Sequence, residues 1–302
     1  MLMWSVAVAL AGAFCMAFGS AMQERDAVRA PGGSVARAGF LLHLAQRPRW
    51  MIGTLAAGGG VALHLVALSG APLTIIQPIG VTGLLFAIVL SAVFNRRRVR
   101  TSQILGGLAV MVGLAGVLLL FPHSAATPHM TTGVGLILTG SVAAIGGAVY
   151  FAAPWLPAGL RAVLLASAGG AALGTTSALA RVVASQTVTD ITAVLTWLTV
   201  LGIAIALFGG LLQQNAYRTG HFAAAYATLL VADPITGAGI GALMLGEGLP
   251  TTPQDQLLAT ASAGLAILGT AVLARAKNRN PEAARPSAVR HELVHQNSGE
   301  TS

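Results

Sequence analysis

The segment TSQILGGLAVMVGLAGVLLLF, residues 101–121, contains no charged side chain. It begins a run from Thr101 to Leu160 without a single Asp, Glu, Lys or Arg. A helix crosses the hydrocarbon core of a bilayer with about 20 apolar residues, so this run holds more than one span. Over the whole chain 55% of the residues are hydrophobic, 9% are charged, and the mean hydropathy is +0.77. These values exclude an ordinary soluble domain and predict an all-α, polytopic membrane protein.

Charges and turn signals divide the chain into nine predicted membrane spans. They lie near residues 2–20, 51–69, 72–95, 101–121, 132–152, 161–182, 190–213, 219–246 and 254–275. The first segment has no basic region before it and the rest of the chain is equally apolar, so we expect a mature span rather than a secretory signal. The predicted fold is a bundle of about nine transmembrane helices.

The positive charges follow a simple topology. With the N-terminus outside, the cytoplasmic segments hold all of the 17 Lys and Arg residues except Arg181; these segments are 21–50, 96–100, 153–161, 214–218 and the tail from 275. An excess of Lys and Arg in cytoplasmic loops sets the orientation of membrane proteins. The net charge of +8 therefore implies no nucleic-acid partner. We expect a multi-pass protein of the cytoplasmic membrane, in contact with the lipid bilayer and with a cytoplasmic C-terminus.

Polar residues recur at matching intervals in the two halves of the chain. Ser20 and Pro78 are 58 positions apart, and Ser177 and Pro234 are 57 apart. Because the second unit starts five spans after the first, it crosses the membrane in the opposite direction, as in the inverted repeats of many secondary transporters. The predicted division is a first repeat at 1–121 (spans 1–4), a linking span at 122–160, a second, inverted repeat at 161–275 (spans 6–9), and a disordered cytoplasmic tail at 276–302.

The basic linker at residues 21–50 has two interpretations. The segment ARAGFLLHL, residues 36–44, fits a short amphipathic helix along the cytoplasmic interface. The alternative is a disordered basic loop. Both stay open.

Asp233 and Pro234 are the most unusual pair within an apolar span. The predicted span 219–246 has 28 residues, about 42 Å as a straight helix against a hydrocarbon core of about 30 Å. Proline removes a backbone donor, so we expect tilt or a break at Pro234. An intramembrane carboxylate is costly and is a functional-site hypothesis by default, which makes Asp233 a candidate proton or cation site. The alternative is a structural aspartate bonded to freed amides or to a polar neighbour.

Other polar residues of the spans are weaker candidates for a substrate or ion pathway. Gln77 and Pro78 occupy the matching place in the first half, and either a substrate contact or an interhelical hydrogen bond explains Gln77. Gln214 and Tyr217 end a span as an interfacial cap or an inner gate. His64 stands alone on its span, where an interhelical bond is favoured over a proton relay. The set is completed by the two serines of the repeat, Ser20 and Ser177.

Three charged residues at span ends are gate candidates: Glu24, Arg181 and Glu247. The alternative for Glu24 and Arg181 is a solvated helix end, and for Glu247 a surface turn. No catalytic triad, metal-ligand spacing or phosphate-binding loop is present, and Cys15 is the only cysteine. We therefore expect no catalytic residue, no metal site, no cofactor and no enzyme activity.

Short motifs in both halves match a known pattern: Gly19-Ser20, Arg37-Ala38-Gly39, Ala71-Pro72-Leu73-Thr74, Pro78-Ile79-Gly80, Gly106, Ser177 with Arg181, Gln214 with Tyr217, Pro234 and Glu247. On these residues the chain resembles the drug/metabolite transporter superfamily, EamA-like, and within it most closely the NIPA group of magnesium transporters. The resemblance covers nearly all of residues 1–275. It implies two inverted halves that move small solutes by alternating access. One departure is Arg97, at a position that is usually acidic in the family, and it makes divalent-cation entry on that side less plausible.

Three functions follow as hypotheses. The leading one is a secondary transporter of a small polar metabolite or drug, with proton coupling through Asp233. The alternative within transport is a magnesium or divalent-cation carrier. The alternative of another class is a non-transporting membrane component that partners an envelope enzyme through residues 21–50. A homo-oligomer is compatible with Gly58, Gly59 and Gly60, since small residues allow close helix approach.

Overall fold

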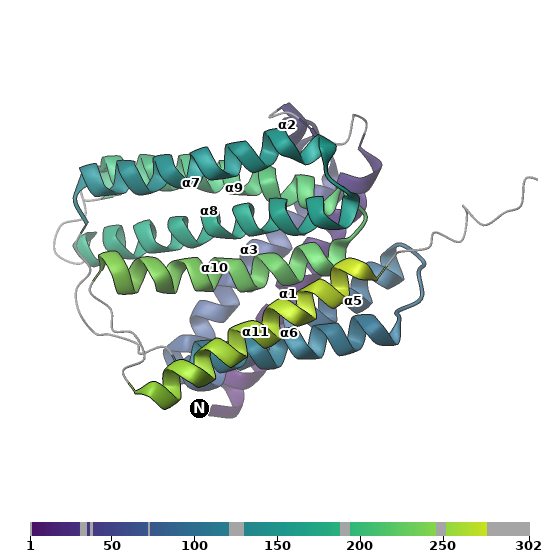
Figure 1. Ribbon diagram of the computed structural model, residues 1–302, viewed down its shortest axis with the longest axis horizontal. Coiled ribbons are helices and arrows are strands. Elements are labelled where there is room, and N and C mark those ends of the chain that lie inside the picture. Colours follow the sequence, from purple (N-terminus) through teal and green to yellow (C-terminus); the bar gives the residue numbers. More distant parts are fainter. Residues whose placement is uncertain are drawn as a thin grey trace, which may run out of the picture.

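The computed structural model describes residues 2–30, 35–36, 39–71, 73–120, 130–187, 194–245 and 252–276. Within these ranges the regular structure is helical, and nine segments are long and apolar enough to cross a membrane. The protein is thus an all-α polytopic membrane bundle, as predicted (Figure 1). The predicted tail, apart from Ala276, and the gate candidate Glu247 lie outside the described residues.

Each predicted span corresponds to a helix or a helix pair. In chain order these are α1 (Leu2–Arg29), α3 (Pro48–Gly70), α4 (Leu73–Val81) with α5 (Gly83–Phe94), α6 (Thr101–Leu120), α7 (Thr132–Ala152), α8 (Ala158–Thr187), α9 (Trp197–Tyr217), α10 (Phe222–Met244) and α11 (Pro253–Arg275). Two short helices lie between spans: α2 (Gly39–Ala45) and the 3-10 helix η1 (Ala153–Trp155). Proline starts α3 and α11, where its missing N–H costs no helical bond.

The two sets of four spans share one packing pattern. In the first half α1 packs against α3 and against α4–α5, and in the second half α8 packs against α9 and α10. The last spans of the halves, α6 and α11, pack against each other. The chain directions are opposite, because the end of α1 and the start of α8 lie at the same end of the bundle (Figure 1). The domain boundaries at residues 121 and 161 remain a prediction.

Glycine allows the close helix approaches on which these pairs depend. A Cβ on Gly60 of α3 would lie 2.7 Å from the carbonyl oxygen of Gly12 in α1. A Cβ on Gly269 of α11 would likewise lie 2.7 Å from the carbonyl oxygen of Gly106 in α6. Without a hydrophobic driving force between helices in lipid, such small-residue contacts supply van der Waals attraction. By contrast, nothing lies within 4 Å of a Cβ built on Gly59, which is exposed on the outer face of α3.

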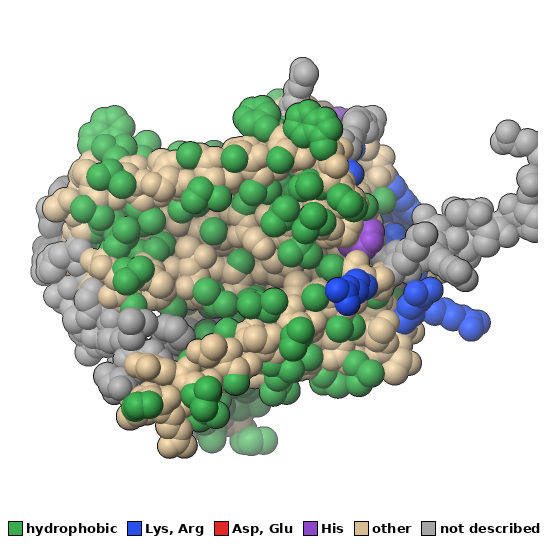
Figure 2. Space-filling view, in the orientation of Figure 1, with side chains coloured by type: hydrophobic (Ala, Val, Ile, Leu, Met, Phe, Trp, Pro, Cys, Tyr) green, Lys and Arg blue, Asp and Glu red, His purple; other side chains and the backbone are tan. Residues whose placement is uncertain are grey.

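We call one end of the bundle the basic end, defined by Arg47, Arg97, Arg161, Arg218 and Arg275. Figure 2 shows arginine side chains gathered there on the face in view, while the flank of the bundle in this view is apolar and uncharged. Large apolar side chains such as Leu207, Ile267 and Leu268 are 64%, 62% and 65% exposed, as expected of surface that meets lipid tails.

The proline helices differ from the prediction. The expected break at Pro234 is wrong, because α10 runs without interruption from Phe222 to Met244. Its 23 residues span about 35 Å, so the helix fits the bilayer without a break. The interruption occurs in the first half, at Thr82, four residues after Pro78. There the hydroxyl of Thr82 donates to the carbonyl oxygen of Ile79 at 2.6 Å, a side-chain bond that bends helices.

Candidate functional site

A closed ring of side chains joins the two halves at the basic end. Gln214 of α9 donates to Gln23 of α1 at 2.9 Å, and Gln23 donates to Thr54 of α3 at 3.1 Å. The indole of Trp50 donates to the other amide atom of Gln214 at 3.3 Å, and Thr54 donates to the carbonyl oxygen of Trp50 at 3.0 Å. Gln23 and Gln214 are 6% and 3% exposed, so the ring replaces the water that these amides would otherwise bind.

Hydroxyl groups form a second contact between the halves, one turn before Gln23 and Glu24. Ser20 of α1 hydrogen-bonds Tyr217 of α9 and Tyr226 of α10. Gln213 donates to the Tyr217 hydroxyl at 2.9 Å. Phe222 packs between the two tyrosines, with ring centroids 5.0 Å from Tyr217 and 5.6 Å from Tyr226. These aromatic rings and hydroxyls are buried, so the contact has few competing solvent partners in the closed structure.

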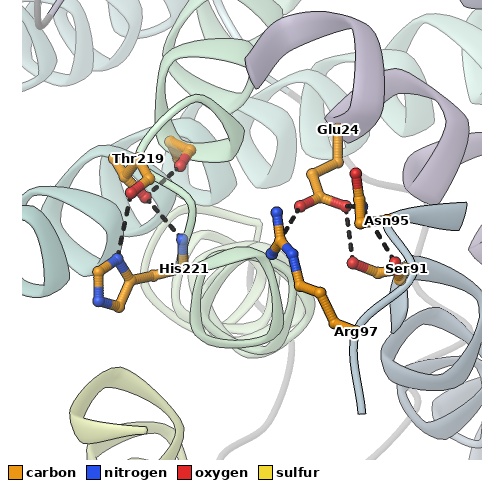
Figure 3. Close-up of polar contacts among 7 residues, drawn as sticks. Glu24, Ser91, Asn95, Arg97, Thr219 and His221 are labelled. Atoms are coloured by element: carbon orange, nitrogen blue, oxygen red, sulfur yellow. Dashed lines mark hydrogen bonds and ion pairs between the residues drawn. The ribbon is translucent and has the colours of Figure 1, made fainter. Parts of the chain in front are cut away.

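The turn between α9 and α10 sets the position of both tyrosines. Gly220 has φ +77, which residues other than glycine rarely adopt. The backbone N–H of His221 donates to the Thr219 hydroxyl at 3.2 Å, and the His221 ring lies 3.2 Å from the Thr219 carbonyl oxygen (Figure 3). These contacts fix where α10 begins and therefore where Tyr226 points.

Glu24 is the buried charge of the site. Its side chain is 0% exposed, and its Oε2 accepts from the Ser91 hydroxyl at 2.6 Å and from the Asn95 amide at 2.8 Å. Arg97, on the chain segment after α5, brings its Nη1 to 3.7 Å from Oε1 (Figure 3). Oε1 itself accepts no hydrogen bond. The solvated-helix-end interpretation of Glu24 is therefore wrong: α1 continues to Arg29 instead of ending near residue 20, and this carries Glu24 into the interior.

The basic linker closes over the same end. Phe40 and Leu44 of α2 are 7% and 0% exposed and belong to the main apolar core, so the helical interpretation holds for residues 39–45 and the disordered alternative is wrong there. Asn215 clamps the backbone of Ala36, accepting from its N–H at 2.7 Å and donating to its carbonyl oxygen at 3.2 Å. The Tyr150 hydroxyl donates to the same carbonyl oxygen at 2.8 Å. Residues 31–34, 37 and 38 lie outside the described residues.

Asp233 lies at the middle of α10, away from the buried polar residues at the basic end. Its backbone packs on α8, where a Cβ on Gly170 would lie 3.1 Å from the Asp233 nitrogen. The side chain is half-buried, and none of the hydrogen bonds and ion pairs in the described part of the chain includes its carboxylate. The alternative of a carboxylate bonded to freed amides is therefore wrong, since α10 is unbroken. The role as a proton or cation site stays a prediction.

Gln77 does not match Asp233 in position. Pro78 is five positions after the start of α4 at Leu73, whereas Pro234 is twelve positions after the start of α10 at Phe222. Gln77 therefore lies near the start of the span formed by α4 and α5, whereas Asp233 lies at the middle of its span. The matching sequence spacing was misleading because the connections before the two helices differ in length. The Gln77 Oε1 is buried and has no hydrogen-bond partner, so the interhelical-bond interpretation is wrong for this atom.

The remaining candidates are dispersed. His64 of α3 packs against α4, with its Cε1 3.1 Å from the place of a Cβ on Gly80. Ser177 and Arg181 are exposed along α8, far along the helix from its start at the basic end, so Ser177 does not join Ser20. Of the predicted residues, the structure brings together Ser20, Glu24, Gln214 and Tyr217.

Several members of the cluster were not predicted: Gln23, Trp50, Ser91, Asn95, Arg97 and Tyr226. Ser91 and Asn95 are four positions apart, which places them on one helical face. This polar pair, close to an arginine within an apolar sequence, was the sequence signal from which part of the site could have been found. Which helix they face could not be read from it.

Two hollows lie near the candidate residues. A pocket of about 20 Å³, room for about one water molecule, is lined by Ser91, Arg97, Arg98 and Gln103 among others. A groove of about 530 Å³ lies between α8, α10 and α11 and includes Ala232 and Ile235, the neighbours of Asp233 and Pro234. The groove is lined mainly by apolar side chains, so a polar solute finds few partners in it.

Comparisons with known proteins give one relative and no function. No family model matches the chain, and no solved structure matches it. The chain is 27% identical over 277 residues to an uncharacterized protein of Corynebacterium glutamicum, and the alignment covers 90% of this chain and 94% of the relative. The similarity extends along the whole bundle rather than along one half of it.

Proposed function

We propose that the protein is a secondary transporter that moves a small polar solute across the cytoplasmic membrane by alternating access. The proposal rests on the polar contacts between the two halves, Gln23 with Gln214 and Ser20 with Tyr217, which we call the joint. Two sets of four spans with the same packing and opposite chain direction meet at the basic end through buried polar side chains. Inverted halves of this kind enclose solute pathways in many secondary transporters.

The chemistry of the joint suits repeated opening. Gln214 is bonded to Gln23, and Tyr217 to Ser20, when the basic end is closed, and each of these side chains can bind water when it is open. The free-energy difference between the two states is then the small net value of exchanged hydrogen bonds, about 0.5–1.5 kcal/mol per bond. An apolar seal of the same size would resist hydration more strongly. The basic end, which we assign to the cytoplasm, thus serves as a gate.

Asp233 and Gln77 extend the proposed pathway beyond this gate. A half-buried carboxylate at mid-helix and a buried amide oxygen without a partner are unsatisfied in the closed structure. Unpaired polar groups inside a membrane protein are costly and mark solute or ion pathways. Solutes with hydrogen-bond donors or a positive charge would satisfy both.

The test combines transport with a reversible lock. In a Cys15→Ser background, Gln23→Cys and Gln214→Cys are joined by a bifunctional thiosulfonate, and flux into proteoliposomes is measured for pools of amino acids, nucleosides, cationic drugs and Mg²⁺. We expect flux of one pool, loss on cross-linking, and recovery with reductant. The Mg²⁺ pool tests the resemblance to magnesium transporters directly. Absence of flux for every pool with folded, unlinked protein would overturn the proposal, as would flux that continues unchanged after complete cross-linking.

A further inference from the structure

We propose that Glu24 is the binding site of a coupling proton, which replaces the guanidinium of Arg97 as the positive partner of the carboxylate when the basic end opens. The inference rests on the transporter function proposed above and names the residue at which coupling occurs. It assigns this role to Glu24 and leaves Asp233 to the solute pathway.

The two oxygens of Glu24 have different environments. Oε2 is held by Ser91 at 2.6 Å and Asn95 at 2.8 Å, and both donors come from α5, which packs on α1. Oε1 is buried, accepts no hydrogen bond, and has only Arg97 nearby at 3.7 Å. Arginine–carboxylate pairs that serve structure are commonly bidentate with N–O distances of about 2.7–2.9 Å. This pair is longer and leaves Oε1 and the Arg97 Nε without hydrogen bonds.

The two partners are attached to the fold in different ways. Glu24 stands on α1, fixed between α3 and α5. Arg97 lies in the non-helical segment between α5 and α6, after Arg96 with φ +51, and the Arg97 side chain is 14% exposed. The pocket of about 20 Å³ beside Arg97 also contacts Ser91 and opens the cluster to a water molecule. Arg97 can therefore move out to the surface while Glu24 stays inside.

Charge balance then requires a replacement. In the closed structure the negative carboxylate and the positive guanidinium sum to zero. When Arg97 leaves for water it keeps its proton, because arginine does not deprotonate in proteins. A buried carboxylate left without a positive partner would be strongly destabilised by desolvation. A proton from a hydronium ion, bound to Oε1, restores neutrality and gives the oxygen a donor for a neighbouring hydroxyl.

Among the described residues Glu24 is the acid that pairs with Arg97, although Asp26, two positions further along α1, is also buried. Tyr217 approaches Glu24 from α9, and Ser20 lies one turn away on α1. From α5 come Ser91 and Asn95, and Arg97 is the positive group that contacts the carboxylate. No cluster of three His, Cys, Asp or Glu exists in the described part of the chain. One carboxylate matches one positive charge, so a proton fits better than a divalent ion.

The test uses a chemical probe that needs no substrate. Dicyclohexylcarbodiimide attacks protonated carboxyl groups in apolar surroundings, and the adduct on each residue is quantified by peptide mass spectrometry. The full-length protein is labelled in detergent at pH 5.5, 7.0 and 8.5, as the wild type, Arg97→Ala, Arg97→Lys and Asp233→Asn. Arg97→Lys keeps the positive charge and serves as the matched control, and a monodisperse elution profile identifies folded variants.

We expect the Glu24 adduct of Arg97→Ala to exceed that of the wild type at least fivefold at pH 7.0 and to fall as the pH rises to 8.5. The adduct in Arg97→Lys and Asp233→Asn should stay within twofold of the wild type. A Glu24 adduct in Arg97→Ala that is no greater than in the wild type, or that does not change with pH, would overturn the proton site. Protection by 150 mM Na⁺ at constant pH would overturn the choice of a proton. Confirmed labelling together with absent flux would instead overturn the transporter function and leave the proton site in place.

Discussion

Substitution of Gln214 by leucine should open the basic end. In the closed structure Gln214 donates to Gln23 at 2.9 Å and accepts from Trp50 at 3.3 Å. Leucine at this position leaves the Gln23 Oε1 and the Trp50 Nε1 without partners. A buried polar group that loses its partner costs about 1–3 kcal/mol, and Trp50 is only half-buried, so we estimate a loss of about 2–4 kcal/mol.

This cost applies to the closed state alone, because water satisfies both groups when the end is open. A change of about 2–4 kcal/mol corresponds to roughly a 30- to 1,000-fold shift of the equilibrium toward the open state. The reporter is a single thiol introduced by Ser20→Cys in the Cys15→Ser background, since Ser20 is 7% exposed beneath the ring. The measurement is its rate of reaction with a membrane-impermeant maleimide. We expect acceleration of at least tenfold.

The matched control is Gln103→Leu, the same substitution at the same end of the bundle. Gln103 accepts a hydrogen bond from the backbone N–H of Arg100 at 3.1 Å, a local and exposed contact at the start of α6 that crosses no interface between the halves. Its maleimide rate should match that of the parent. Equal rates in Gln214→Leu and Gln103→Leu, with both proteins folded, would refute the assignment of the ring as a gate.

Three further outcomes are expected. Gly60→Ala should lower the unfolding midpoint in detergent by the equivalent of about 1–3 kcal/mol, because its Cβ would overlap α1. Gly59→Ala has no neighbour within 4 Å, so its higher helix propensity should raise the midpoint by the equivalent of up to about 1 kcal/mol. Equal shifts of the two variants would refute the packing argument. Asn215→Ala should remove the two hydrogen bonds to the backbone of Ala36 and speed proteolysis of the linker at least several-fold, as measured by time-resolved gel analysis. An unchanged rate of proteolysis would count against the clamp. Asp233→Asn should raise the unfolding midpoint, because it removes a half-buried carboxylate that has no hydrogen bond in the described residues. A lowered midpoint would contradict this and would indicate a partner that stabilises the charge.

The spans could be predicted from the sequence because hydropathy alone determines them. Runs such as residues 101–121 cannot form anything but a membrane helix or a fully buried one, and the chain is too apolar for the latter. Helix ends were harder to place. The span containing Pro234 was predicted at 219–246, but the turn at Gly220 and the helix end at Met244 shorten it to 23 residues. The predicted break followed from that excess length and disappears with it.

The site could be predicted only in part, because it depends on which helix faces meet. Glu24 looked like a solvated end because it follows an apolar span and precedes a basic linker. Its burial comes from α5, whose Ser91 and Asn95 supply the two donors, and from the linker that returns over the same end. Neither contact leaves a periodic pattern in the sequence. Gln214 and Tyr217 were found because several polar residues end one span together, which is a local signal.

The fold gives a physical reason for an arginine at position 97. Arg97 stands where the resembled family usually has an acidic residue, and this made divalent-cation entry less plausible. In the structure it faces Glu24 at 3.7 Å, so an acid at this position would place two negative charges together in a buried site. Such a pair would cost far more than the single carboxylate that is present. The residues at positions 24 and 97 therefore constrain each other: a carboxylate buried on α1 requires a positive group that can reach it from the segment after α5. Because that segment is not helical and lies at the basic end, the same requirement places the neutralising charge on the part of the site best able to move.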